Sequence, residues 1–205
     1  EITVTAQRRE ELLQDVPLAV SAFTRDQLDT LQVDQALDLG RLVPNLIAHN
    51  NTGLGTANSY SLRGLNNTES IATFDPPVGS YVDDIYVARQ NANNFTLFDV
   101  DRIEVLRGPQ GTLFGRNTTG GAVRVLLKKP AEELGGYAEL GIGEFDRYVM
   151  RGSVDIPVSD AVLTKFSAFY VDDDGFVANI TTGETLKGEE KLGLRGAVLR
   201  KIADG

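Results

Sequence analysis

Five glycines lie close together in the middle of the chain, and glycine-rich turns are one way in which proteins bind phosphate. The residues are Gly108, Gly111, Gly115, Gly120 and Gly121. A phosphate-binding loop needs a Gly-Lys-Ser/Thr step that opens a helix, so that backbone N–H groups and the lysine hold the phosphates. Here Arg116-Asn117 follows Gly115, and the residues after Gly121 are typical of a strand. The pattern therefore argues against nucleotide binding.

Side chains capable of acid–base or metal chemistry are scattered along the sequence. Asp83 and Asp84 are adjacent on an expected strand, so their carboxylates should point to opposite faces and not converge on one substrate. The chain has one histidine, His49, and no cysteine, which leaves little material for a zinc site. The acidic run Asp172-Asp173-Asp174 lacks the ligand spacing of a calcium loop. We therefore predict no catalytic residue, no metal site and no cofactor.

The composition limits the class of partner and the way in which the chain meets a membrane. The formal net charge is −9 over 205 residues, which argues against a nucleic-acid partner because phosphate binding requires a basic face. No run approaches the roughly 18 apolar residues that a transmembrane helix needs. A transmembrane β-strand would escape such a search, since its apolar residues only alternate with polar ones.

The glycines belong to a strand–turn–strand segment, Phe98 to Pro130, around which the chain is organised. Its first strand is expected at Asp101–Leu106, where β-branched residues alternate with charged ones. Pro109 ends this strand because it has no N–H to donate to a sheet. Thr112–Phe114 is expected as a tight turn, and a second strand at Ala122–Leu127. Such a wedge must pack closely against another surface.

This segment resembles the signature at the end of the plug domain in TonB-dependent outer-membrane receptors. The matching residues are Asp101-Arg102-Ile103-Glu104-Val105-Leu106-Arg107-Gly108-Pro109, Gly111, Gly115-Arg116-Asn117-Thr118-Thr119-Gly120-Gly121-Ala122 and Lys129-Pro130. Arg124 departs from the pattern, because the family more often has a small polar or amide residue there. The resemblance implies a receptor and not an enzyme, in the bacterial outer membrane. Its implied fold is an α+β plug, a small mixed β-sheet with short helices.

The chain starts with a short β-prone run. It reads Glu1-Ile2-Thr3-Val4-Thr5-Ala6 and is followed by polar residues. Taken alone, the run is typical of a frayed terminal strand. In the family that the chain resembles, an acidic, β-branched hexapeptide ending in Thr-Ala just ahead of the plug is the TonB box. An extended segment with free backbone groups can add as a strand to a partner sheet. The resemblance therefore implies that TonB binds these residues, and we expect a flexible leader that transmits a pull.

Strands and short helices are expected between this leader and the central segment. The elements are a strand at Val16–Phe23, helices at Thr24–Leu31 and Asp34–Leu42, and strands at Tyr60–Gly64 and Val78–Ala88. Thr24 and Gln27 have the spacing of a capping box, which predicts the start of the first helix. Both helices are interpreted as packing elements without chemistry of their own.

Three polar loops, rich in asparagine, alternate with these strands. Asparagine is common in turns because it tolerates a left-handed backbone, so an ordinary structural role stays open. In the family that the chain resembles, such plug loops face the extracellular mouth and contact the ligand. The residues assigned to ligand binding on that basis are His49, Asn50, Asn51, Asn66, Asn67, Arg89 and Asn91.

Arg63 and Arg107 each precede a glycine at the end of an expected strand. Two surface arginines beside turns would have the same pattern. The resemblance implies instead that both form ion pairs between the plug and carboxylates on the inner wall of a barrel. A buried guanidinium needs such a partner, because an uncompensated buried charge costs on the order of 3–5 kcal/mol. The partners would lie beyond residue 205.

After Pro130, apolar and charged residues alternate in four successive runs. The strands are expected at Tyr137–Gly143, Arg147–Ile156, Val162–Tyr170 and Leu192–Val198. A soluble sandwich would also alternate, but the pattern fits the lipid-facing and lumen-facing sides of membrane strands. The expected domains are a TonB box at 1–6, a plug at 7–130, and the first antiparallel strands of a large transmembrane β-barrel at 131–205. The long acidic connection Asp172–Glu190 is expected outside the cell.

Plugged outer-membrane transporters have about 22 strands, many more than the four expected here. Open sheet edges are not tolerated in lipid. We therefore expect that the chain is a fragment, or that another polypeptide completes the barrel.

The predicted function is TonB-dependent active uptake of a scarce solute across the bacterial outer membrane. A ferric siderophore ranks first by family frequency, with an oligosaccharide or cobalamin next. The expected partners are TonB with its inner-membrane energising complex, outer-membrane lipid and a small-molecule ligand. Two alternatives stay open: a ligand-sensing signal transducer, which would need a further domain ahead of Glu1, and a non-transporting binding module.

Overall fold

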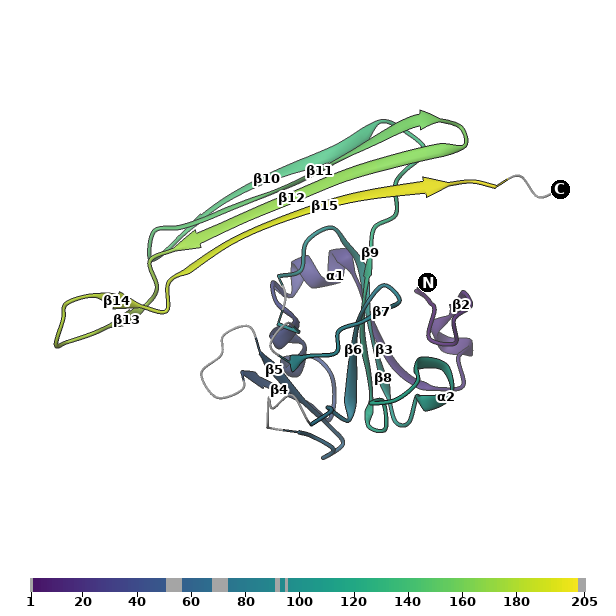
Figure 1. Ribbon diagram of the computed structural model, residues 1–205, viewed down its shortest axis with the longest axis horizontal. Coiled ribbons are helices and arrows are strands. Elements are labelled where there is room, and N and C mark those ends of the chain that lie inside the picture. Colours follow the sequence, from purple (N-terminus) through teal and green to yellow (C-terminus); the bar gives the residue numbers. More distant parts are fainter. Residues whose placement is uncertain (1, 51–56, 68–73, 91–92, 95, 203–205) are drawn as a thin grey trace. The chain divides into compact units, whose positions relative to one another are not determined.

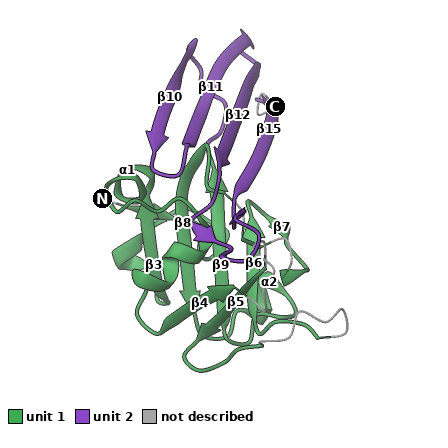
Figure 2. Cartoon of the chain, turned by 90° about the vertical axis from the view of Figure 1, so that its left-hand side faces the viewer, with its two compact units in different colours: residues 1–127 green, residues 128–205 purple. Residues whose placement is uncertain are grey.

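The computed structural model describes residues 2–50, 57–67, 74–90, 93–94 and 96–202. The chain divides into two compact units, Glu1–Leu127 and Lys128–Gly205, which Figure 2 colours green and purple. No helix in the described ranges is both long enough and apolar enough to cross a membrane. The first domain predicted from the sequence ends at Pro130, whereas the first compact unit of the structure ends at Leu127.

A five-stranded sheet forms the centre of the first unit, in the order β3-β8-β9-β6-β7 (Figure 1). The strands are β3 (Ala19–Thr24), β8 (Val100–Arg107), β9 (Gly121–Leu127), β6 (Val78–Val82) and β7 (Ile85–Tyr86). β6 pairs with β9 in parallel, whereas the other pairs are antiparallel. This is the small mixed sheet that the sequence predicts.

The single strand predicted at Val78–Ala88 is wrong, because the structure has the β6–β7 hairpin there. Asp83 starts the turn with φ at +52°, a left-handed conformation that aspartate tolerates better than most residues. Its Oδ1 accepts a hydrogen bond from the Leu127 N–H at 2.8 Å, which fixes the turn to β9. Asp83 and Asp84 are therefore turn residues, and the argument about opposite faces of one strand does not apply to them.

Two short helices cover one face of the sheet. α1 (Arg25–Thr30) begins with the predicted capping box, in which the Thr24 and Gln27 side chains each accept a hydrogen bond from the other residue's backbone. The second element, η2 (Ala36–Arg41), is a 3-10 helix inside the range where a helix was predicted. Both are short, so their stability comes from the sheet against which they pack.

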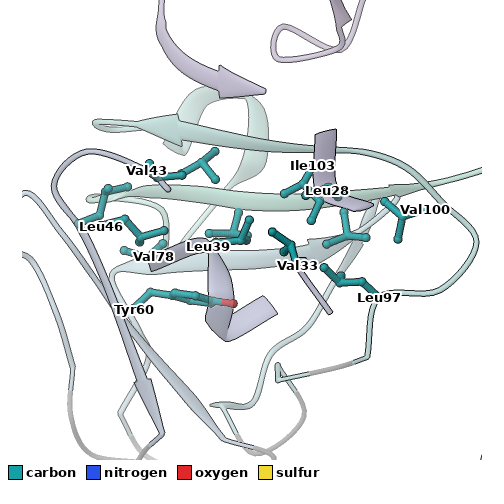
Figure 3. Packing of buried hydrophobic residues seen from close by; sticks show 14 residues of the cluster. Leu28, Val33, Leu39, Val43, Leu46, Tyr60, Val78, Leu97, Val100 and Ile103 are labelled. Atoms are coloured by element: carbon teal, nitrogen blue, oxygen red, sulfur yellow. The ribbon is translucent and has the colours of Figure 1, made fainter. Parts of the chain in front are cut away.

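The larger apolar core lies between the sheet and this layer of helices. Alternate residues of β8 and β9 point into it, namely Ile103, Val105, Val123 and Val125. The hairpin of β4 (Leu46–Asn50) and β5 (Asn58–Leu62) adds Leu46 and Tyr60. Figure 3 shows Leu28 and Leu39 of the two helices meeting these side chains.

The N-terminal residues and a one-turn helix cover the opposite face of the sheet. The elements are β1 (Thr3–Val4), β2 (Glu11–Leu12), η1 (Leu13–Asp15) and α2 (Gly111–Phe114). Their buried cluster comprises Val4, Ala6, Val16, Ala22, Tyr81, Leu106, Phe114 and Ala122. The sheet is thus buried on both faces, and residues before β3 form one of its two covers.

The second unit is a four-stranded antiparallel sheet in the order β10-β11-β12-β15. The strands are β10 (Gly135–Gly143), β11 (Arg147–Ser159), β12 (Val162–Asp173) and β15 (Glu189–Arg200). A small hairpin, β13 (Val177–Ala178) with β14 (Thr185–Leu186), lies in the long connection between β12 and β15. All four strands that the sequence predicts in this region are confirmed.

The two faces of this sheet differ in chemistry as the alternation predicts. One face is apolar and exposed, and includes Leu140, Met150, Phe166, Leu192 and Leu194. The other carries charged residues that pair across strands. Asp155 and Lys165 lie directly opposite each other, with 3.1 Å between Asp155 Oδ2 and Lys165 Nζ.

Gly121 is required where β9 begins beside β8. Its φ is +148°, and a Cβ added there would lie 2.2 Å from the Leu106 carbonyl oxygen and 2.5 Å from Leu62 Cδ2. The neighbouring atom is backbone of the paired strand, so it has no room to move. A side chain at this position would therefore separate β9 from β8.

We predict that Gly121→Ala lowers the free energy of unfolding of the first unit by roughly 2–4 kcal/mol, from left-handed strain and overpacking. Chemical denaturation of the protein measures this change. Gly111→Ala is the matched control, because a Cβ at Gly111 has no atom within 4 Å. Equal stability of the two variants would contradict the role given to Gly121.

Candidate functional site

The segment assigned to TonB binding is docked on the plug in this structure. β1 pairs with β2, and the Leu13 N–H donates a hydrogen bond to the Ile2 carbonyl at 2.9 Å. Val4 and Ala6 are fully buried. The expectation of a flexible leader is therefore not met for residues 2–6, because these side chains complete the smaller core. Glu1 lies outside the described residues.

An ion pair lies in the sheet beneath this segment. Glu104 of β8 and Arg124 of β9 occupy directly opposite positions, and 2.7 Å separates Glu104 Oε2 from Arg124 Nη1. Their side chains are 0% and 3% exposed, respectively. Arg102 Nε lies 2.9 Å from the other Glu104 oxygen. Each buried charge therefore has an opposite charge within hydrogen-bonding distance, as burial requires.

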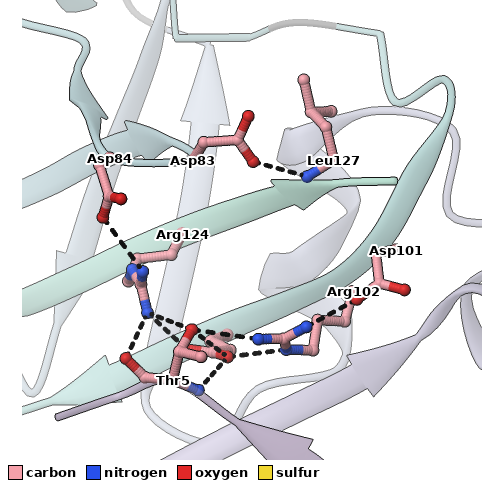
Figure 4. A network of polar contacts seen from close by, with 8 residues as sticks. Thr5, Asp83, Asp84, Asp101, Arg102, Arg124 and Leu127 are labelled. Atoms are coloured by element: carbon pink, nitrogen blue, oxygen red, sulfur yellow. Dashed lines mark hydrogen bonds and ion pairs between the residues drawn. The ribbon is translucent and has the colours of Figure 1, made fainter. Parts of the chain in front are cut away.

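Thr5 binds both members of this ion pair (Figure 4). Its backbone N–H donates to Glu104 Oε1 at 2.7 Å, and its carbonyl accepts from Arg124 Nη1 at 2.9 Å. Its hydroxyl oxygen accepts from Arg102 Nη2 at 3.0 Å and from Arg124 Nη1 at 3.1 Å. Hydrogen bonds to charged groups are stronger than neutral ones, so this one residue is held firmly.

Arg124 makes further contacts through its guanidinium, although its buried Nε has no hydrogen-bond partner among the described residues. Its Nη2 lies 3.6 Å from Asp84 Oδ1, and its guanidinium carbon lies 5.1 Å from the centre of the Phe114 ring. Arg8 lies over the same ring at 5.5 Å. The sequence marked Arg124 as a departure from the family pattern but did not indicate these partners, since Thr5 is 119 residues away.

The prediction that His49 and Asn50 lie in a loop is wrong, because their backbones pair with β5 and they are the last two residues of β4. The described residues Asn66, Asn67 and Arg89 lie outside the strands. Asn50, Asn66 and Arg89 are exposed, whereas His49 and Asn67 are half-buried. The Asn67 carbonyl accepts hydrogen bonds from Ser59 Oγ at 2.7 Å and Gln90 Nε2 at 2.9 Å, which joins the second and third loops. Asn51 and Asn91 lie outside the described residues.

A buried amide cluster, which the sequence did not indicate, supports the third loop. Asn93 exchanges two hydrogen bonds with the backbone of Asn58, at 2.6 and 2.8 Å. Asn94 donates to the Gln35 side chain at 3.0 Å. Several asparagines of the polar stretches are therefore structural, which is the ordinary role that the sequence left open.

Tyr60 of β5 joins this cluster through its phenol. The Asn58 side chain donates a hydrogen bond to its oxygen at 3.2 Å. Burial raises the pKa of the Tyr60 phenol well above the ordinary value, although the hydrogen bond from Asn58 lowers it in part. Burial therefore favours the neutral phenol over the phenolate at this position.

Of the two arginines assigned to plug–barrel ion pairs, Arg63 has its guanidinium beside Gly108, the residue that follows Arg107. The position of a Cβ on Gly108, the residue after Arg107, is 3.6 Å from Arg63 Nη1. Arg63 is exposed, with φ at +53°. Arg107 Nε is buried and has no hydrogen-bond partner among the described residues. The Arg107 guanidinium therefore has a buried donor that no described residue satisfies.

Comparison with known proteins decides the family of this chain. A family model described as the TonB-dependent receptor plug domain matches residues 12–122, more than half of the chain. The chain belongs to the TonB-dependent receptor family. The match includes β8 and Glu104, but residues 1–6 and Arg124 lie outside it.

Similar proteins include outer-membrane receptors and transporters of known name. The pesticin receptor of Yersinia pestis is 30% identical over 167 residues, which cover 81% of this chain and 24% of that protein. The vitamin B12 transporter BtuB of Vibrio vulnificus (strain YJ016) is 23% identical over 204 residues, or 99% of this chain and 33% of that protein. The crystal structure of the ferric yersiniabactin uptake receptor FyuA from Yersinia pestis matches with a TM-score of 0.76 and 28% identity. This match covers 88% of the present chain and 28% of the FyuA chain.

Membership in the TonB-dependent receptor family confirms several predictions. The mixed plug sheet followed by antiparallel strands is the family's arrangement, and the family is one of outer-membrane receptors, not of enzymes. This chain spans about a quarter to a third of the length of the relatives named above. The substrate and the partners of the whole receptor are therefore proposals.

The raised pKa of Tyr60 leads to a pH prediction. Above about pH 10, the ordinary tyrosine pKa, the unfolded chain loses this proton whereas the folded chain keeps it, so the plug should lose stability as the pH rises. Tyr60→Phe should reduce that loss. Unfolding followed between about pH 8 and 11 measures the slope. Tyr86→Phe, at a half-buried tyrosine, is the control, and equal slopes in both variants would contradict the prediction.

Proposed function

We propose that the whole receptor takes up a scarce solute across the outer membrane, with energy supplied through TonB. The observation that supports this most strongly is the strand-forming segment 2–6, which is ordered on the plug just ahead of the residues that match the family. The outer membrane has no ATP supply of its own, so movement of the plug needs a partner that pulls from within the cell. Residues 1–6 are the proposed TonB-binding segment.

TonB would bind this segment by strand addition. Backbone N–H and C=O groups supply affinity in such complexes, and side chains at alternate positions supply specificity. The residues proposed to bind TonB are Glu1, Ile2, Thr3, Val4, Thr5 and Ala6. The apolar residues Val4 and Ala6 alternate with the polar residues Thr3 and Thr5. An added strand would therefore present apolar side chains to one side and polar side chains to the other. A pull on this strand would first separate it from β2 and then act on β8 and β9.

The ligand would bind at the plug loops together with extracellular loops of the receptor. The proposed contacts are His49, Asn50, Asn51, Asn66, Asn67, Arg89 and Asn91. A ferric siderophore is our first choice, since a relative's structure is that of a ferric yersiniabactin uptake receptor. Cobalamin is the next choice from the relative named as a vitamin B12 transporter, and an oligosaccharide would suit the amide-rich loops.

Arg63 and Arg107 are proposed to hold the plug inside the barrel. The unused Nε of Arg107 is a donor that a carboxylate on the barrel wall would satisfy. Such pairs would fix the plug at rest and would have to exchange partners when it moves. The partner carboxylates would belong to the part of the receptor beyond residue 205.

Deletion of residues 1–6 from the full-length receptor should abolish energised accumulation of the ligand and leave surface binding unchanged. The reason is that the deletion removes the proposed TonB strand but none of the loops assigned to the ligand. Whole-cell uptake against a panel of ferric siderophores, cobalamin and oligosaccharides measures both quantities. Accumulation at the parental level would refute energy coupling through these residues.

Substitution of exposed residues assigned to the ligand should instead weaken ligand binding at the surface. The triple variant Asn50→Ala, Asn66→Ala, Arg89→Ala should weaken ligand binding about tenfold or more, because hydrogen bonds to the ligand are lost. Equilibrium binding of the transported ligand to whole cells measures the affinity. The control is Gln14→Ala, at an exposed residue of η1 on the other face of the plug. Unchanged affinity in the triple variant would contradict the assignment of these residues to the ligand site.

A further inference from the structure

We propose that Glu104 and Arg124 form a latch that holds residues 3–6 on the sheet and sets how often this segment leaves it. The proposal rests on the function given above, because it concerns how the proposed TonB-binding strand becomes available. It assigns a role to a buried ion pair in which Arg124 departs from the family pattern.

The latch uses the same backbone groups that a partner strand would need. The N–H of Thr5 donates to Glu104, and the carbonyl of Thr5 accepts from Arg124. Strand addition requires these N–H and C=O groups to be free for the incoming chain. While Thr5 is bound to the ion pair, its backbone is unavailable to TonB. The docked state is therefore an inhibited state.

The geometry also makes release reversible. Glu104 and Arg124 are paired with each other at 2.7 Å, and Arg102 contacts the same carboxylate at 2.9 Å. When Thr5 leaves, neither buried charge loses its counter-charge, so the large penalty of an unpaired buried ion does not arise. What is lost is the set of hydrogen bonds to Thr5 and the burial of Val4 and Ala6. Those contacts can form again when the segment returns.

Apolar burial alone does not explain the docked position. Val4 and Ala6 would be satisfied by any arrangement that removes them from water, because the hydrophobic effect has no direction. The contacts to Thr5 are directional, and they involve its N–H, carbonyl and hydroxyl oxygen at once. The ion pair therefore also fixes the register of the segment on the sheet.

Thiol labelling of Ala6 gives a direct readout of release. The chain has no cysteine, and Ala6 is fully buried when docked, so a cysteine at this position reacts only when the segment leaves. The parent for this test is full-length receptor carrying Ala6→Cys, with any cysteine beyond residue 205 replaced. It is prepared in outer-membrane vesicles from cells without TonB. The measured quantity is the rate of modification by a water-soluble maleimide.

Thr5→Val is the sharpest variant for this test. It keeps the shape of the side chain and leaves Glu104 and Arg124 untouched, but it removes the hydroxyl that both Arg102 and Arg124 contact. Labelling should become roughly ten- to a hundredfold faster, the factor expected when hydrogen bonds to charged groups are lost. Thr3→Val is the matched control, at an exposed threonine two residues before Thr5. Its labelling rate should stay at the parental value.

Exchange of the two charges tests the backbone contacts. In E104R/R124E the two exchanged side chains can still pair with each other, although Arg102 and Asp84 then face like charges. A donor faces the Thr5 N–H and an acceptor faces its carbonyl, so labelling should again accelerate. The control is D155K/K165D, which reverses a comparable cross-strand pair in β11 and β12. Melting temperature shows whether each receptor is folded. If E104R/R124E does not fold, Thr5→Val decides alone.

Parental labelling rates in Thr5→Val, or in a folded E104R/R124E receptor, would overturn the latch. This outcome is separate from a failure of the proposed function, since the vesicles contain no TonB and labelling needs no uptake. Faster labelling together with normal uptake after deletion of residues 1–6 would leave the latch standing and remove only the coupling role.

Discussion

A carboxylate and a guanidinium buried in the middle of a sheet must stay paired, and this constraint determines how one face of the plug is built. Glu104 and Arg124 lie opposite each other on β8 and β9, both almost fully buried. Apolar side chains alone cannot cover such a pair, because its remaining donors and acceptors need partners. The N-terminal segment provides polar and apolar groups together. Thr5 binds the ion pair, and its sequence neighbours Val4 and Ala6 add apolar side chains to the cover.

The two covers of the sheet therefore differ in how firmly they are held. The helices and the β4–β5 hairpin share a large apolar core with β8 and β9, and their removal would expose all of it. The cover formed by the N-terminal residues shares a smaller cluster and a set of polar contacts to one residue. Segments with few buried apolar contacts open at the lowest free-energy cost. The N-terminal cover is thus the one that the proposed pull at the N-terminus would separate from the sheet more easily.

Local patterns in the sequence predicted most of the strands and the first helix. The alternation in β8, β9 and the four strands after Pro130 and the capping box at Thr24 each depend on residues a few positions apart. The parts that sequence analysis missed depend on distant pairs. Thr5 and Arg124 are 119 residues apart, and Asn58 and Asn93 are 35 apart. A buried arginine and an exposed one look alike in a sequence, so Arg124 was recognised as unusual but not as a binding partner.

Under the proposed function, ligand binding would release the docked leader so that TonB can bind it. Hydrogen–deuterium exchange of the backbone at residues 2–8 in the full-length receptor tests docking and release most directly. The Thr5 amide is bonded to a buried carboxylate, so this peptide should exchange slowly in the free receptor and become fast once the transported ligand is bound. Exchange as fast as that of an unstructured peptide in the free receptor would contradict docking. Slow exchange that the ligand leaves unchanged would contradict release.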